Sequence, residues 1–260
     1  MTSRLAPRRR RGLTDPARAW RLALGLVLYA ASIALLVHSG LGNMPWDVLS
    51  QGVSRRLGWT LGTTTVVISV LVLAAWIPLR QRPGSGTVAN VVVIGVLVDP
   101  FLAALALLPD LPLGARAAMA AGAIALNGVA TACYIGARLG PGPRDGLMTG
   151  VVARTGWPLR LVRTGIEVLV VASGWLLGGT AGVATAVYAV AIGPIVHVLL
   201  PRFSVPGDPG AATAPAAGAV ASVGPTGASG QAVTPGSDPG RPSDEGAADC
   251  GSGTPGSRRT

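Results

Sequence analysis

The sequence predicts an all-α polytopic membrane protein with about six transmembrane helices arranged as two inverted three-helix repeats. Three observations predict this fold: a low content of charge, a series of long apolar runs, and an internal duplication. Half of the 260 residues are hydrophobic, 12% are charged, and the mean hydropathy is +0.53. A soluble domain has about 25% charged residues, so this chain has too few charges to cover a water-facing surface.

Six apolar runs approach the roughly 20 residues that a helix needs to cross a hydrocarbon core of about 30 Å. They cover residues 20–40, 60–79, 86–108, 117–138, 159–178 and 181–201. The first run follows a basic arm, as in a signal peptide, but it has the length of a full span. We therefore interpret it as a permanent helix.

These runs divide the chain into four parts. Residues 1–18 form a cytoplasmic Arg-rich arm, 19–108 the first membrane repeat, 109–203 the second, and 204–260 a disordered C-terminal tail. The tail consists mainly of Gly, Pro, Ala, Ser and Thr, and such a composition has too little apolar surface to offset the entropy of ordering.

The basic residues, all of them arginine, predict the orientation. Placing the N-terminus inside leaves three arginines in the outer loops, Arg55, Arg56 and Arg116, and the others on the cytoplasmic side. This bias predicts that both termini are cytoplasmic. The formal charge of +10 lies in the arm and at the span flanks, which is typical of a lipid-bilayer partner and argues against nucleic acid.

The duplication is visible at a fixed offset of 98 residues. LGNMPWDVLSQGVSRRLGWTL (41–61) matches LGPGPRDGLMTGVVARTGWPL (139–159) at 11 of 21 positions without a gap. Each repeat contains three crossings, an odd number, so the second copy enters the membrane from the opposite side. Inverted repeats of this kind are common in secondary transporters, which bind their substrate at the repeat interface.

Each repeat carries a P-x-D motif, Pro45-Trp46-Asp47 and Pro143-Arg144-Asp145. Proline at the first helical position and an acid in the first turn predict that Pro45 and Pro143 begin short helices. Two interpretations remain open: surface helices with the aspartates as caps, or helices that dip inward with their N-termini facing a shared cavity. In the second, these six residues bind a small molecule or ion. Arg144 would hold an anion, although it could also pair with Asp145 or face lipid headgroups.

Polar residues inside the spans are further candidates, because ionisable groups at membrane depth are costly. They are Asp99, Glu167, Asn90, Asn127 and His197, together with His38 near a span end. For Glu167 the simpler expectation is an ion pair with Arg163 at i, i+4. We expect Asp99 to be solvated near the outer surface and both histidines to be interfacial.

Other residue types point to structural roles. The six tryptophans mostly mark span edges, as interfacial anchors do. Cys133 is expected to be a small buried residue. No metal-ligand spacing, phosphate loop or catalytic triad occurs in the sequence. We therefore predict no enzyme activity, no metal and no cofactor.

LGNMPWDVLSQG, LGPGPRDGLMTG and the later GTVANVVVIGVLVD resemble the bacterial YczE/YyaS/YitT group of membrane proteins, most closely its YczE-like members. The resemblance covers residues 20–203 and implies a multi-pass protein of the bacterial cytoplasmic membrane. It implies no particular activity. The leading hypothesis is a small permease or exporter; the alternative is a non-transporting accessory or regulatory protein. A homo-oligomer or a protein partner is left open.

Overall fold

The structure is a computed structural model, and it describes residues 16–203. The predicted C-terminal tail and nearly all of the Arg-rich arm lie outside these residues. The described part is all-helical, without strands, and contains eight helices. They are α1 (Pro16–Ser39), α2 (Pro45–Leu57), α3 (Leu61–Trp76), α4 (Ser85–Leu105), α5 (Leu113–Gly136), α6 (Pro143–Thr155), α7 (Leu159–Leu176) and α8 (Val183–Phe203).

The two short helices α2 and α6 follow from local sequence. Pro45 and Pro143 occupy the first helical turn, with Asp47 and Asp145 in the same turns, as predicted. Both helices end at a glycine in the left-handed conformation, Gly58 and Gly156. Glycine adopts this conformation without the penalty of a Cβ atom, so it stops the helix and lets the chain turn.

Four of the described helices, α1, α4, α5 and α8, are long and apolar enough to cross a bilayer. Taken as one bent span, α2 and α3 would be a fifth, although their axes meet at 116°. Helix α7 is absent from this set. It has 18 residues but carries three charged ones, Arg160, Arg163 and Glu167.

The outer faces of the long helices are apolar, as lipid contact requires. On α4, Val88, Val92 and Val96 lie four residues apart and are each more than half exposed. Helix α8 exposes valines in the same way, including Val190 at 72%. Water would disfavour such stripes, whereas lipid tails do not, so the exposed apolar faces are those of a membrane protein.

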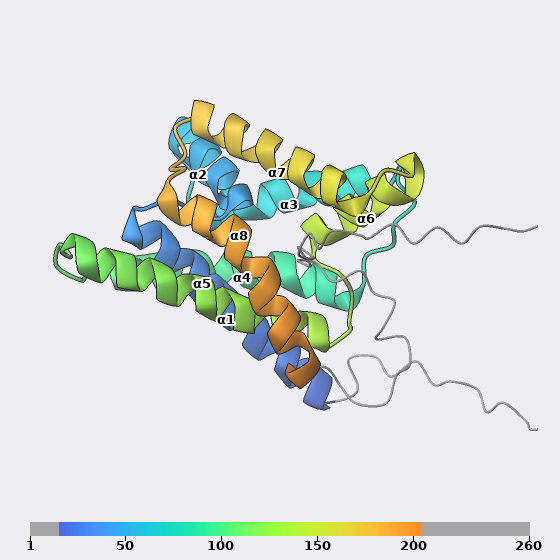
Figure 1. The fold of residues 1–260 in the computed structure, drawn as a ribbon, viewed down its shortest axis with the longest axis horizontal. Coiled ribbons are helices and arrows are strands. Elements are labelled where there is room, and N and C mark those ends of the chain that lie inside the picture. Colours follow the sequence, from blue (N-terminus) through green and yellow to red (C-terminus); the bar gives the residue numbers. More distant parts are fainter. Residues whose placement is uncertain (1–15, 204–260) are drawn as a thin grey trace, which may run out of the picture. The chain divides into compact units, whose positions relative to one another are not determined.

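The described helices recur in the same order in both halves of the chain. Helices α2 and α6 have 13 residues each, α4 and α8 have 21 each, and the members of each pair begin 98 residues apart. Figure 1 shows α7 alongside α2, so each half packs against the other. Backbone hydrogen bonds also join the two halves, each from the first turn of a helix to a loop. Ala184 N of α8 donates to Leu41 O at 3.1 Å, and Gly86 N of α4 donates to Leu139 O at 2.9 Å.

The main core lies where α1 and α5 run side by side (Figure 1). Leu26, Ile33 and Leu36 of α1 are fully or almost fully buried there. The close approach depends on Gly25, because a Cβ atom at this position would lie 2.8 Å from the backbone nitrogen of Tyr134. Cys133 is buried in α5, as predicted.

Two groups of residues differ from expectation. Trp46 and Trp76 are 6% and 1% exposed, so they are not interfacial anchors, whereas Trp20, Trp59, Trp157 and Trp175 are exposed. Asp99 is half-buried, and its Oδ1 accepts a hydrogen bond from Gly62 N at 2.9 Å. Its carboxylate thus caps the positive N-terminal end of α3 instead of lying free in solvent.

Candidate functional site

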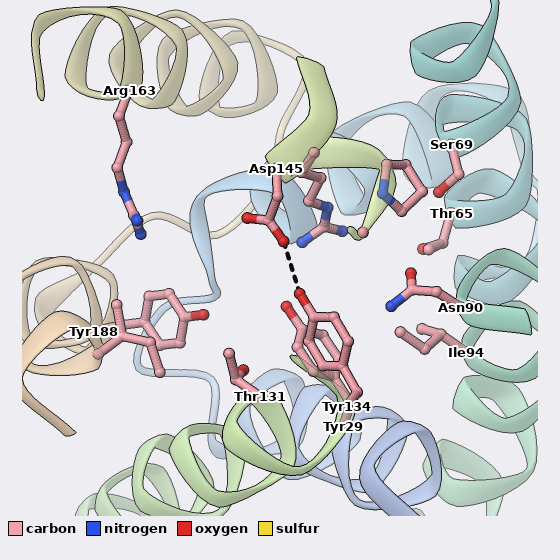
Figure 2. Close-up of a pocket in the computed structure, with 14 residues that line it drawn as sticks. Tyr29, Thr65, Ser69, Asn90, Ile94, Thr131, Tyr134, Asp145, Arg163 and Tyr188 are labelled. Carbon is pink, nitrogen blue, oxygen red and sulfur yellow. Dashed lines mark hydrogen bonds between the residues drawn. The ribbon is translucent and has the colours of Figure 1, made fainter. Parts of the chain in front are cut away.

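A cavity of about 80 Å³ lies inside the helix assembly, lined by seven helices, all but α2. One water molecule needs roughly 10–15 Å³ by the same measure, so the cavity has room for a small solute or several waters. Figure 2 shows its walls, with Thr65, Ser69 and Asn90 on one side and Tyr188 and Arg163 on the other.

The cavity draws equivalent positions from both halves. At the offset of 98 residues, its lining contains Thr65 with Arg163, Asn90 with Tyr188, and Ile94 with Ile192. In two of these pairs the residue type differs, so the walls are related in position but not in chemistry. Both halves of the chain therefore contribute to the cavity wall at positions 98 residues apart.

The first turns of α2 and α6 meet beside this cavity. Arg144 of α6 donates from Nη2 to Asp47 Oδ1 of α2 at 2.9 Å, and the side chains are 22% and 2% exposed. The guanidinium also lies over the ring of Trp46, 5.5 Å from its centroid. Oδ2 of Asp47 is buried and accepts no hydrogen bond from any described residue.

The start of α6 is held from two directions. Trp76 Nε1 donates to the carbonyl of Pro143 at 3.0 Å, and the Trp76 ring lies so close to Gly146 that a Cβ atom there would be 2.0 Å from it. On the other side, Tyr134 Oη donates to Asp145 Oδ2 at 2.7 Å (Figure 2). These contacts fix the segment that carries Arg144 and Asp145.

The start of α2 is held by a buried amide. Gln51 Oε1 accepts hydrogen bonds from Asn43 Nδ2 at 2.9 Å and from Thr180 N at 2.7 Å. Asn43 N in turn donates to Thr180 O at 3.1 Å. The loop between α7 and α8 therefore binds the segment preceding α2 through the backbone N and O of Thr180. Because these hydrogen bonds fix the start of α2, they favour one position for Asp47.

A second polar network connects α1, α5 and α8 at one wall of the cavity. Asn127 is fully buried; its Nδ2 donates to Ser32 Oγ at 2.9 Å, and its Oδ1 accepts from Tyr188 Oη at 3.0 Å. The offset places Tyr29 opposite Asn127 and Asn90 opposite Tyr188. Each of these two pairs of equivalent positions therefore holds one tyrosine and one asparagine. The tyrosine is in the first half in one pair and in the second half in the other.

The structure brings most of the predicted site residues together. Pro143, Arg144, Asp145 and Asn90 line the cavity, Asp47 and Trp46 contact Arg144, Pro45 is buried at the start of α2, and Asn127 contacts the lining residue Tyr188. Asp99, Glu167 and His197 do not line it, and His197 is exposed. Glu167 pairs with Arg163 at 2.9 Å, as the sequence predicts.

Tyr29, Tyr134 and Tyr188 are cavity residues that the sequence reasoning missed. They are the three tyrosines of the whole chain, and all three face the cavity. Their rarity within apolar spans, and the pairing of Tyr29 and Tyr188 with asparagines at the repeat offset, were the available signals. Among residues 16–203, no three His, Cys, Asp or Glu side chains are grouped as a metal ion would require.

Replacing Tyr134 by phenylalanine should lower the free energy of unfolding by about 1.5–2 kcal/mol. The substitution leaves the Asp145 carboxylate without its phenol donor, and hydrogen bonds to charged groups contribute about 1.5–3 kcal/mol. Unfolding in mixed detergent micelles measures the change. Tyr29→Phe is the control, because it removes a phenol hydroxyl from the same cavity without removing the hydrogen bond to Asp145. A larger loss of stability for Tyr29→Phe than for Tyr134→Phe would contradict the stabilising role of the Tyr134–Asp145 hydrogen bond.

The chain is similar to several bacterial proteins. Residues 17–201 match the family of unknown function DUF6198. An uncharacterized protein of Haemophilus influenzae is 37% identical over 202 residues, covering 76% of this chain and 92% of its own.

Two Bacillus subtilis proteins also match. The uncharacterized membrane protein YczE is 32% identical over 180 residues, covering 68% of this chain and 83% of its own, and the uncharacterized protein YyaS is 25% identical over 181 residues, with 68% and 90% covered. No solved structure matches the chain. The family match and the YczE relative, together with the exposed apolar helices, place the protein in the membrane: it belongs to the DUF6198 family and is a YczE-like membrane protein.

Proposed function

We propose that this protein is a small transporter that binds a small polar solute in the cavity between its two halves. The observation that carries the proposal is the cavity itself, lined by repeat-related residues and bordered by the first turns of two broken helices. Transporters of inverted-repeat architecture bind substrates at such a place, because helix N-termini and unpaired side chains can replace the water that the solute loses.

The proposal includes six crossings in two inverted repeats, in which α1, α3 and α4 cross in the first half and α5, α7 and α8 in the second. The bend of 116° after α2 supports a re-entrant helix followed by a returning one. The first seven residues of α2 include six that are buried, a pattern unlike that of a helix lying on the surface. The charges of α7 fit this scheme because Arg163 lines the cavity instead of lipid.

The lining favours a polar solute over an apolar one. Its polar groups include the guanidinium groups of Arg144 and Arg163, the carboxylate of Asp145 and the hydroxyl of Thr65. The Thr65 hydroxyl is buried and makes no hydrogen bond with any described residue. A bound solute with a donor or acceptor would satisfy the Thr65 hydroxyl, whereas an apolar solute would leave it unpaired, at a cost of about 1–3 kcal/mol. The three charged groups already have partners within the protein, and their charges favour a polar solute over an apolar one.

Thermal stabilisation of the purified full-length protein across a panel of small metabolites tests the proposal. A ligand present at 100 times its Kd should stabilise the wild type by about 2.7 kcal/mol. Arg144→Gln should abolish the response, because it removes a charge that faces the cavity. Arg56→Gln is the matched control, since Arg56 is exposed at the end of α2 and should respond as the wild type does.

Uptake of the stabilising compound into liposomes then separates transport from binding alone. The proposal expects saturable uptake by the wild type and by Arg56→Gln, and none by Arg144→Gln. The absence of a response to any compound, with the variants folded and membrane-inserted, would refute the transporter proposal. It would favour the alternative of an accessory protein that acts through a protein partner.

A further inference from the structure

The buried ion pair between α2 and α6 constrains what the cavity can bind. Asp47 already neutralises Arg144 at 2.9 Å, and Asp47 is 1% exposed. Arg163, the other cationic group in the lining, is engaged by Glu167 at 2.9 Å. A second anion bound at Arg144 would therefore meet Asp47 and Asp145 without a cation of its own.

Two anionic groups that share one cation in a buried site cannot both remain charged at low cost. The usual outcome is that the site takes up one proton. Asp47 is the carboxylate that we expect to take this proton, because its Oδ2 is buried and accepts no hydrogen bond from the described residues. Asp145, in contrast, already uses its Oδ2 to accept the Tyr134 hydroxyl.

The neighbours of Asp47 offer no other way to balance the charge. Tyr29 on α1 and Tyr188 on α8 line the same cavity, and a phenol group ordinarily carries no charge near neutral pH. Helix α3 has no titratable side chain. Helix α7 meets α2 around Gly174, where no residue titrates; its nearest charged residue, Glu167, is seven residues and thus about 10 Å away along the axis.

We propose that the Asp47–Arg144 pair couples the binding of one small oxyanion to the uptake of one proton. The anion takes the Arg144 guanidinium, whose planar fork matches a carboxylate or a similar oxyanion. Asp47, released from Arg144, takes the proton on its carboxylate. One negative and one positive charge enter together, so binding leaves the net charge of the site unchanged. This inference rests on the proposed function and names its substrate class: small monovalent oxyanions.

Nitrate and acetate are suitable probes, and nitrate stays charged at every working pH. Their affinity for the purified full chain is measured from pH 5.5 to 8.5 by titration calorimetry. With one proton taken up per anion, the affinity should fall about tenfold for each unit of pH rise wherever the free Asp47 is ionised. Adding nitrate to weakly buffered protein should remove close to one proton per chain from solution.

The variant Asp47→Asn separates oxyanion binding from proton uptake. It keeps the size of the side chain but cannot gain or lose a proton, so its nitrate affinity should be independent of pH, with no proton uptake. Asp110→Asn, in an exposed position between α4 and α5, should keep the wild-type slope. The proton count on the wild type needs no variant, so the test survives even if Asp47→Asn does not fold.

The outcomes distinguish this inference from the proposed function. Nitrate or acetate binding that depends on Arg144 but takes up no proton would refute the coupling and leave the transporter proposal standing. A wild type that binds neutral or cationic metabolites but neither oxyanion would refute the substrate class alone. A wild type that binds nothing in either panel would refute both.

Discussion

Replacing Asp47 by alanine should lower the free energy of unfolding by about 3 kcal/mol. The substitution leaves the Arg144 guanidinium inside the helix assembly without its carboxylate, and breaking a buried ion pair on one side costs about 3–5 kcal/mol. The lower end is expected because the Arg144 side chain is 22% exposed and also lies over Trp46. Unfolding of the purified protein in mixed micelles measures the loss.

The double variant Asp47→Asn with Arg144→Gln is the control for this effect. Removing both charges leaves no unpaired ion, so most of the lost stability should return, since neutral replacements of buried pairs are often tolerated. A double variant that loses the sum of the two single effects would show that the residues do not interact. A loss below about 1 kcal/mol for Asp47→Ala would show that the pair is solvated, as surface pairs are.

Replacing Gly42 by alanine should be about as damaging, with an expected loss of roughly 3 kcal/mol. Gly42 has a φ of +126°, and a Cβ atom there would lie 2.8 Å from the backbone nitrogen of Gly182. Both the backbone strain and the overpacking cost about 1–3 kcal/mol each. The loop before α2 would have to leave the start of α8, and the hydrogen bond from Ala184 N to Leu41 O would be lost with it.

Gly58→Ala is the matched control for Gly42→Ala. Gly58 also has a positive φ, +69°, but nothing lies within 4 Å of its added Cβ atom. It should cost about 1 kcal/mol, the penalty of the left-handed conformation alone. Equal losses at Gly42 and Gly58 would contradict the close crossing of the two halves. Gly140 and Gly156 provide the same comparison in the second half.

Features encoded over a few residues could be predicted from the sequence. Pro45 and Pro143 fix the starts of α2 and α6, because proline restricts φ and lacks the amide hydrogen that a first turn leaves unused. The ion pair of Arg163 with Glu167 follows from a spacing of four residues. The four longest apolar helices follow from their length and composition.

Partners far apart in the sequence could not be predicted. Arg144 pairs with Asp47, 97 residues away, and not with the adjacent Asp145 that local reasoning offers. Trp76 has the composition and position of an interfacial anchor, yet its indole donates to Pro143 O across the helix assembly. Asp99 caps a helix that begins 38 residues earlier, at Leu61. Such choices depend on how whole helices pack, which a local pattern does not contain.

Alternating access to the cavity requires that the two halves have opposite orientations in the membrane. The direct test is cysteine labelling at Leu57 and Thr155, repeat-equivalent and exposed positions at the ends of α2 and α6. Each is replaced by cysteine in a chain whose Cys133 and Cys250 are changed to alanine and serine, and whole cells are treated with a membrane-impermeant maleimide. We expect Leu57→Cys to react in intact cells, and Thr155→Cys to react only after permeabilisation. Reaction of both positions from the same side would contradict the inverted repeat, and with it a cavity reached alternately from the two faces of the membrane.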